Sequence, residues 1–140
     1  MIDKERILRR LTDLERYSNV MMEIVPSSYA KYAASDMKTK AAVERYVQLI
    51  SDIELEVMAL LYKGLDFGIA GGEEPLANGL SNVLSAEVIN SFRKRRALRD
   101  SLVHAYFDMH YDKETFGEAS NLSDIAKFIK EVKKIIDKRS

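Results

Sequence analysis

The longest amphipathic segment of the chain extends from about Asp36 to Tyr62 and contains neither glycine nor proline. Its apolar residues recur at intervals of three and four positions, which is the period of one face of an α-helix. They are Ala42, Val43, Tyr46, Leu49, Ile50, Ile53, Val57, Leu60 and Leu61. The pattern predicts a helix of about seven turns. Because its apolar stripe is wide, other helices must cover it.

Three further segments show the same period and could supply that cover. The first two span residues 3–24 and about 86–107, and the third ends near residue 138. Residues suited to N-capping stand at their starts, namely Asp3, Ser85, and Ser120 or Ser123. No strand pattern competes with these helices. The sequence therefore predicts an all-α fold, an up-and-down bundle of four main helices plus short extra helices, in one domain covering residues 1–140.

Two connecting stretches differ in composition. Residues 26–35, "PSSYAKYAAS", predict a short helical turn entered at Pro26, and this proline also ends the first long helix. Residues 63–79 contain five of the six glycines and the second proline, which predicts a break between two structural halves. Apolar residues within this stretch favour packing against the bundle. Its "GIAGGEEP" run lacks the preceding strand and the spacing of a nucleotide-binding loop, so we interpret it as a flexible connection.

The charge and composition of the chain exclude several classes of protein. Lysine plus arginine equals aspartate plus glutamate at 22 each, so any contact with nucleic acid or an anionic membrane must be local. The absence of cysteine excludes disulfides and thiolate metal sites. The acidic residues show no Glu-x-x-His or similar ligand spacing, so we predict no metal and no other cofactor. The charged N-terminal segment resembles neither a signal peptide nor a membrane span, and we expect a cytoplasmic protein.

The segment "RKRRALRDSLVHAYFD" places five cationic residues and one of the two histidines on the third predicted long helix. At about 100° per residue, Arg99 and Tyr106 lie almost above one another. Asp100 and His104 form an i,i+4 pair, roughly 100–140° around the helix from Arg99. A guanidinium, a carboxylate, an imidazole and a phenol therefore share one broad sector of the helix, with Arg96 beside them.

These groups suit the chemistry of an RNA phosphodiester. An imidazole can move a proton near neutral pH, and a nearby carboxylate can orient it. An arginine offers a fixed, bidentate charge to a phosphate, including one that gains charge in a transition state. Together they suit metal-free cleavage, in which the ribose 2′-hydroxyl attacks the adjacent phosphate.

A solvated helix face with i,i+4 ion pairs is the alternative interpretation, and from spacing alone it is the commoner of the two. The same two interpretations apply to the basic run "RKRRALR", which is either a solvent-exposed helix surface or a local phosphate site. For a phosphate site, Arg95 and Arg96 are the expected RNA contacts.

The stretch "RDSLVHAYFD" resembles the Arg-x(4–6)-His signature of the HEPN superfamily, in the extended Arg-x4-His-x-Tyr form of the HepT-like toxins of prokaryotic toxin–antitoxin pairs. The matching residues are Arg99, His104 and Tyr106. The order of elements is similar as well: a first helix with "LERY", a second with "AVERYVQLISDIE", a loop, the motif helix and a C-terminal amphipathic helix. The motif is short, and the combination of motif, helix order and length is considerably more specific.

This resemblance implies a HEPN bundle that forms a homodimer, with the two motif helices meeting at a shared cleft. It implies a metal-independent ribonuclease toxin in which Arg99 stabilises the phosphate and His104 acts on the 2′-hydroxyl or on the leaving oxygen. The partner it implies is an MNT-class nucleotidyltransferase antitoxin, which could neutralise the toxin by adding nucleotide to Tyr106.

One position departs from the family pattern. The residue after the motif arginine is often Asn in this family, and here it is Asp100. Its carboxylate could repel the scissile phosphate, or it could support catalysis by holding His104 in place. The alternative function is a non-catalytic helical interaction module that binds a nucleotidyltransferase.

Overall fold

The computed structural model describes residues 1–104 and 111–139, and within these ranges all regular secondary structure is helical. The prediction of an all-α chain is confirmed. The helices are α1 (Lys4–Ile24), α2 (Tyr29–Ala33), α3 (Met37–Gly64), α4 (Glu73–Leu80), α5 (Ala86–His104), α6 (Asp112–Ser120) and α7 (Ser123–Arg139). No helix in these ranges has the length and apolar character needed to cross a membrane.

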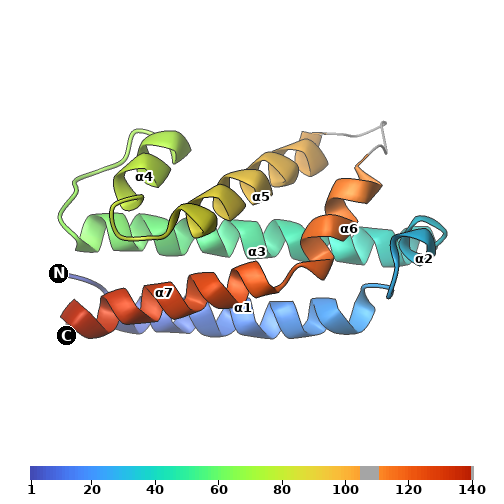
Figure 1. Cartoon of the computed structure of the whole chain (residues 1–140), viewed down its shortest axis with the longest axis horizontal. Coiled ribbons are helices and arrows are strands. Elements are labelled where there is room, and N and C mark those ends of the chain that lie inside the picture. The colour runs from blue at the N-terminus through green and yellow to red at the C-terminus, as the bar shows by residue number, and fades with distance from the viewer. Residues whose placement is uncertain (105–110, 140) are drawn as a thin grey trace.

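The long helices α1 and α3 lie side by side along one axis, and α5 is inclined to them (Figure 1). The central one, α3, packs along α1 on one side and along α5 on the other. The helices α6 and α7 follow one another and complete the bundle, and α7 packs against α1 and α5. Both chain termini lie at the same end of the bundle, and α2 lies at the opposite end (Figure 1).

Side chains that accept hydrogen bonds from the backbone start the main helices. The Asp3 carboxylate accepts from the Arg6 N–H at 3.3 Å, and the Asp36 carboxylate accepts from the Thr39 N–H at 2.8 Å. The Ser85 hydroxyl accepts from the backbone N–H three residues on, at 3.2 Å, and donates to Glu131 of α7 at 2.8 Å. These caps satisfy N–H groups that have no partner within the helix. The predicted caps Asp3 and Ser85 are confirmed.

The glycine-rich stretch is more ordered than its sequence predicts. The last turn of α3 extends to Gly64, and α4 forms within the segment that we interpreted as a flexible connection. The helix is held because Leu76, Ala77 and Leu80 are buried against the bundle. Of the apolar residues before α4, Leu65 is buried, whereas Ile69 is fully exposed. The expected packing of this stretch is therefore confirmed only in part.

The helix boundaries near the motif bear on the site. Described residues of α5 end at His104, so the predicted end of this helix near residue 107 lies outside the described ranges. The short helix α6 ends at Ser120, and α7 begins at Ser123. The prediction that Ser120 or Ser123 caps the last helix is wrong. Ser120 is the last residue of α6 and its hydroxyl donates to the Phe116 carbonyl, whereas Ser123 is the first residue of α7 and its hydroxyl donates to Asn121.

Candidate functional site

The basic run on α5 is neutralised by carboxylates from four other helices. At its start, the Arg93 guanidinium donates to Glu74 of α4 through Nε at 3.2 Å and Nη2 at 2.7 Å, and Nη2 also donates to Asn78 at 2.8 Å. The Lys94 ammonium lies 4.0 Å from Glu118 of α6 and is largely exposed. The first part of the run therefore fixes neighbouring helices to α5.

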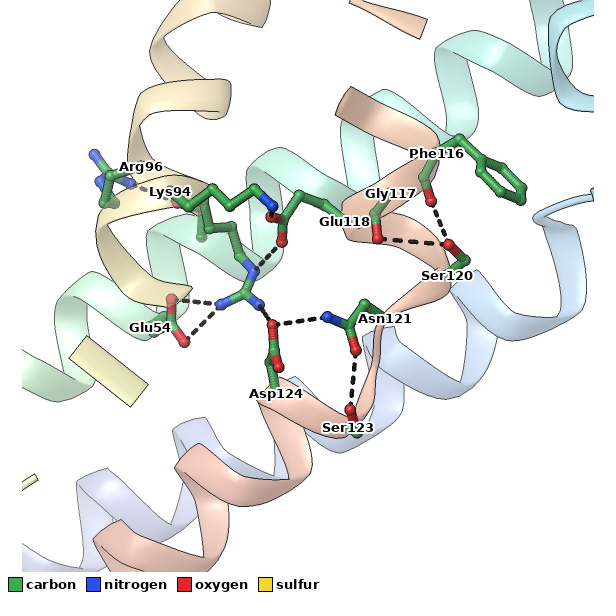
Figure 2. Close-up of polar contacts among 12 residues, drawn as sticks. Glu54, Lys94, Arg96, Phe116, Gly117, Glu118, Ser120, Asn121, Ser123 and Asp124 are labelled. Carbon is green, nitrogen blue, oxygen red and sulfur yellow. Dashed lines mark hydrogen bonds and ion pairs between the residues drawn. The ribbon is translucent and has the colours of Figure 1, made fainter. Parts of the chain in front are cut away.

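Arg95 lies in the core, where three carboxylates converge on its guanidinium. Its Nη1 donates to both oxygens of Glu54 at 2.9 Å, its Nε lies 3.4 Å from Glu118, and its Nη2 lies 3.7 Å from Asp124. Figure 2 shows Glu54, Glu118 and Asp124 approaching this point from α3, α6 and α7. One buried cation therefore connects four helices.

Arg95, Glu54, Glu118 and Asp124 form what we call the Arg95 cluster, which has more acidic than basic side chains. Burial raises the pKa of Glu54, attraction to Arg95 opposes this shift, and repulsion from Glu118 and Asp124 adds to it. Arg95 itself is 1% exposed. A guanidinium so enclosed has no exposed surface that a phosphate could contact. The expectation that Arg95 contacts RNA is therefore corrected: Arg95 instead holds the helices of the bundle together.

Arg96 and Arg99 share one carboxylate on α3. The Asp52 Oδ1 atom lies 2.8 Å from Arg96 Nη1 and 3.0 Å from Arg99 Nε. Arg96 also donates to the Ser51 hydroxyl at 3.2 Å and pairs through Nε with Glu73 of α4. Its side chain is 10% exposed. An RNA contact by Arg96, which the sequence leads us to expect, would have to replace these protein partners.

The motif residues occupy the last turns of α5. The Arg99 side chain is 28% exposed, and its Nη1 donates to Asp100 at 3.3 Å. His104 is exposed at the end of the described part of the helix. Asp100 and His104 share a helix face as an i,i+4 pair, but in residues 1–104 and 111–139 Asp100 pairs with Arg99 and makes no hydrogen bond or ion pair with His104. Tyr106 lies outside the described residues.

The arrangement offers limited but defined chemistry. Arg99 and His104 are five positions apart on one helix, and both reach the surface. Arg99 is held on the protein side by Asp52 and along the helix by Asp100. A phosphate that approaches from solvent would meet a guanidinium whose position is already set, with an imidazole one turn further along the helix.

Sequence reasoning missed Asp52 as a partner of Arg96 and Arg99, and Glu73 as a partner of Arg96. Both carboxylates come from elements distant in sequence, and Glu73 lies in the segment that we interpreted as a flexible connection. No spacing within α5 could identify them. Glu54, in contrast, lies seven positions from both Val47 and Leu61 on the apolar stripe of α3, and this placement is a readable signal of a buried charge.

Comparison with known families gives one match that covers most of the chain. The family model described as "Ribonuclease HepT-like" matches residues 7–132. No curated protein matches the chain.

The solved structures that share the fold include these three. A cytosolic protein of unknown function, YutE from Bacillus subtilis, superposes with a TM-score of 0.81 at 15% identity, covering 99% of this chain and 93% of that one. A mutant of the toxin–antitoxin MntA-HpeT gives a TM-score of 0.78 at 14% identity, covering 91% and 97% of the two chains. A toxin–antitoxin structure with AMP-PNP gives 0.79 at 17% identity, covering 95% and 98%.

Proposed function

The chain belongs to the ribonuclease HepT-like family, and from this membership and the geometry of α5 we propose that it is the ribonuclease toxin of a prokaryotic toxin–antitoxin module. The observation that carries the proposal is the placement of the motif residues. Arg99 and His104 both reach the surface on the last turns of a helix that the core holds firmly. We propose that the enzyme acts in the cytoplasm and needs no metal or other cofactor.

In the proposed reaction, Arg99 binds the scissile phosphate and stabilises the charge that the phosphate gains in the transition state. His104 takes the proton from the ribose 2′-hydroxyl as this oxygen attacks phosphorus, or gives a proton to the 5′-oxygen that leaves. The products are a 2′,3′-cyclic phosphate and a free 5′-hydroxyl. Asp100 supports Arg99 through its hydrogen bond to Nη1.

The reaction requires both a base and an acid, and one imidazole supplies only one of them at a time. A homodimer whose motif helices meet would bring two His104 side chains to one cleft. The half-buried Leu102 and Val103 leave apolar surface beside the motif, which supports an interface at this place. We therefore propose that the active unit is a homodimer.

The proposed partner is an MNT-class nucleotidyltransferase that acts as antitoxin. Two of the structurally similar proteins are toxin–antitoxin assemblies, and one of these was solved with AMP-PNP. A nucleotidyltransferase uses a nucleoside triphosphate as donor, and the hydroxyl of Tyr106 is the proposed acceptor. An adduct there would place a bulky negative group two residues from His104.

The test is an RNA cleavage assay with the purified chain in the presence of EDTA. The wild-type chain should cleave RNA and leave 2′,3′-cyclic phosphate ends. His104→Ala should lower the rate by about 10²- to 10⁴-fold, which is the usual contribution of a proton-transfer group. Asn90→Ala is the matched control, because Asn90 is exposed on the same helix about four turns away. Cleavage that survives in His104→Ala would refute the assignment of the site.

A non-catalytic interaction module is the second candidate, and a specific observation favours it. Every cation of the basic run has a carboxylate within ion-pair distance. A module of this kind would bind a nucleotidyltransferase through the motif surface without cleaving RNA. Expression of the chain alone separates the two functions: growth arrest supports the toxin, whereas partner binding without arrest supports the module.

A further inference from the structure

Asp52 joins the motif arginine to the rest of the protein. This α3 residue places a single oxygen, Oδ1, within 3.0 Å of Arg99 Nε and 2.8 Å of Arg96 Nη1. The Nε atom of Arg99 is buried, and its contact with Asp52 is an ion pair without hydrogen-bond alignment. The Nε atom is therefore turned toward the protein and closed to a substrate.

The two terminal nitrogens of Arg99 differ from Nε. Nη1 lies 3.3 Å from Asp100, whose side chain is 53% exposed. Nη2 donates no hydrogen bond within the described ranges. Because a guanidinium is planar and rigid, the two contacts together, Nε with Asp52 and Nη1 with Asp100, define the plane in which Nη2 can meet a phosphate oxygen.

Asp52 is itself held in place by a chain of contacts. Arg96 binds it and also binds Ser51 of α3 and Glu73 of α4. Since Arg96 has little exposed surface, solvent competes weakly for these contacts. Three helices, α3, α4 and α5, thus contribute to the position of Asp52.

We propose that Asp52 is a positioning residue for the reaction: it orients the Arg99 guanidinium so that Nη2 faces the scissile phosphate. This inference rests on the proposed ribonuclease function and adds to it a residue outside the motif. The opposite role, in which Asp52 masks Arg99 and must leave before RNA binds, is less consistent with the contacts. A masking carboxylate would accept hydrogen bonds from the terminal nitrogens, whereas the nearest approach of Asp52 is to Nε and no hydrogen bond joins it to Nη1 or Nη2.

The kinetic test compares Asp52→Ala and Asp52→Asn with wild type. Loss of the carboxylate in Asp52→Ala should lower kcat by about 10- to 100-fold, because the guanidinium can then leave the productive orientation. KM should change little, since the positive charge of Arg99 remains. Asp52→Asn should retain more activity than Asp52→Ala, because its amide oxygen can still contact Nε. A rise in cleavage or in RNA affinity with either variant would establish masking and overturn the proposal.

Glu56→Ala is the matched control. Glu56 lies one turn further along α3 and also bridges two arginines, Arg6 and Arg10 of α1, each at 2.9 Å. Its partners belong to α1 and not to the motif helix α5, so its loss should leave kcat unchanged. An equal fall in kcat for Glu56→Ala and Asp52→Ala would show a general effect of α3 charge and would overturn the proposal, as would full activity in Asp52→Ala.

A second measurement is independent of catalysis. In ¹⁵N NMR spectra of the full-length chain, the Arg99 Nε–H should exchange slowly with solvent in the wild type and at least tenfold faster in Asp52→Ala. Unchanged exchange would overturn the positioning role even if activity falls. If the wild-type chain cleaves no RNA, the proposed function fails, and the exchange rate alone decides whether Asp52 holds Arg99.

Discussion

Asp100 shows how one side chain can favour or oppose the proposed reaction. Its carboxylate accepts a hydrogen bond from Arg99, which helps to hold the guanidinium, but its negative charge also lies beside the guanidinium that we propose binds the phosphate. Asp100 is largely exposed, so solvent screens this repulsion and its cost is modest. The effects of the hydrogen bond and of the charge can be separated by replacing Asp100 with Asn, because the Asn amide keeps the acceptor oxygen and has no charge.

Asp100→Asn should therefore raise the rate of RNA cleavage by about two- to fivefold, as expected for removal of one screened like charge. Single-turnover rates at two ionic strengths provide the measurement, and the gain should shrink at high salt. A large fall in the rate would instead support the role first inferred from the sequence, in which the charge of Asp100 orients His104.

The residues of the site were only partly predictable from the sequence. The reason is that the position of a residue around the helix axis, and not only its charge, determines whether it is buried. Arg95 lies seven positions after Val88 and three after Phe92, both buried, so it continues the apolar stripe of α5. The composition of the basic run suggested an RNA contact, whereas its helical phase indicates burial. The acidic partners on α3 and α4 could not be inferred, since pairing across helices depends on how the helices pack.

At the level of helices, the four long segments follow directly from their apolar period and their caps. The short helices are harder to predict, because isolated helices of this length are unstable and depend on tertiary contacts. The helix α4 is the clearest case: its sequence contains Pro75 and Gly79, yet buried leucines and ion pairs to α5 hold it in place. Information about those contacts is absent from the local sequence.

Two helical glycines provide a test of this dependence on packing. A Cβ atom at Gly79 of α4 would lie 2.5 Å from the Tyr62 ring, whereas a Cβ atom at Gly117 of α6 would have no neighbour within 4 Å. Gly117→Ala should therefore raise the free energy of unfolding by about 0.5–1 kcal/mol, through helix propensity alone. Gly79→Ala should lower it by about 1–3 kcal/mol, because the ring or the helix must move.

Urea denaturation of the two variants beside wild type measures both changes. The opposite signs are the informative result, since the same substitution is made within two short helices, near the end of α4 and inside α6. Stabilisation by Gly79→Ala would show that α4 can shift away from α3 without loss.

At the scale of the whole molecule, the Arg95 cluster connects the helices that surround the motif. Arg95→Met would leave Glu54, Glu118 and Asp124 without their shared cation, and it should lower the free energy of unfolding by about 3–5 kcal/mol. Adding Glu54→Gln to this variant should recover part of the loss, because one buried charge is then removed.

The cost of Arg95→Met should depend on pH. Burial raises the pKa of Glu54 in the folded chain, so the folded state binds this proton more tightly than the unfolded state does. Loss of the Arg95 charge raises this pKa further. Stability of Arg95→Met should thus fall as pH rises through the raised pKa, and the difference from wild type should be larger at neutral than at acid pH. Unfolding curves at both conditions provide the check, and an equal cost at both would contradict it.

The up-and-down path of the chain also determines where the molecule can be extended. Both termini lie at one end of the bundle, whereas α5 runs away from them, so that its motif turns lie toward the other end (Figure 1). A purification tag or a fluorescent protein fused at either terminus would therefore be held away from Arg99 and His104. Immobilising the chain through either end would likewise leave the motif surface facing the solution.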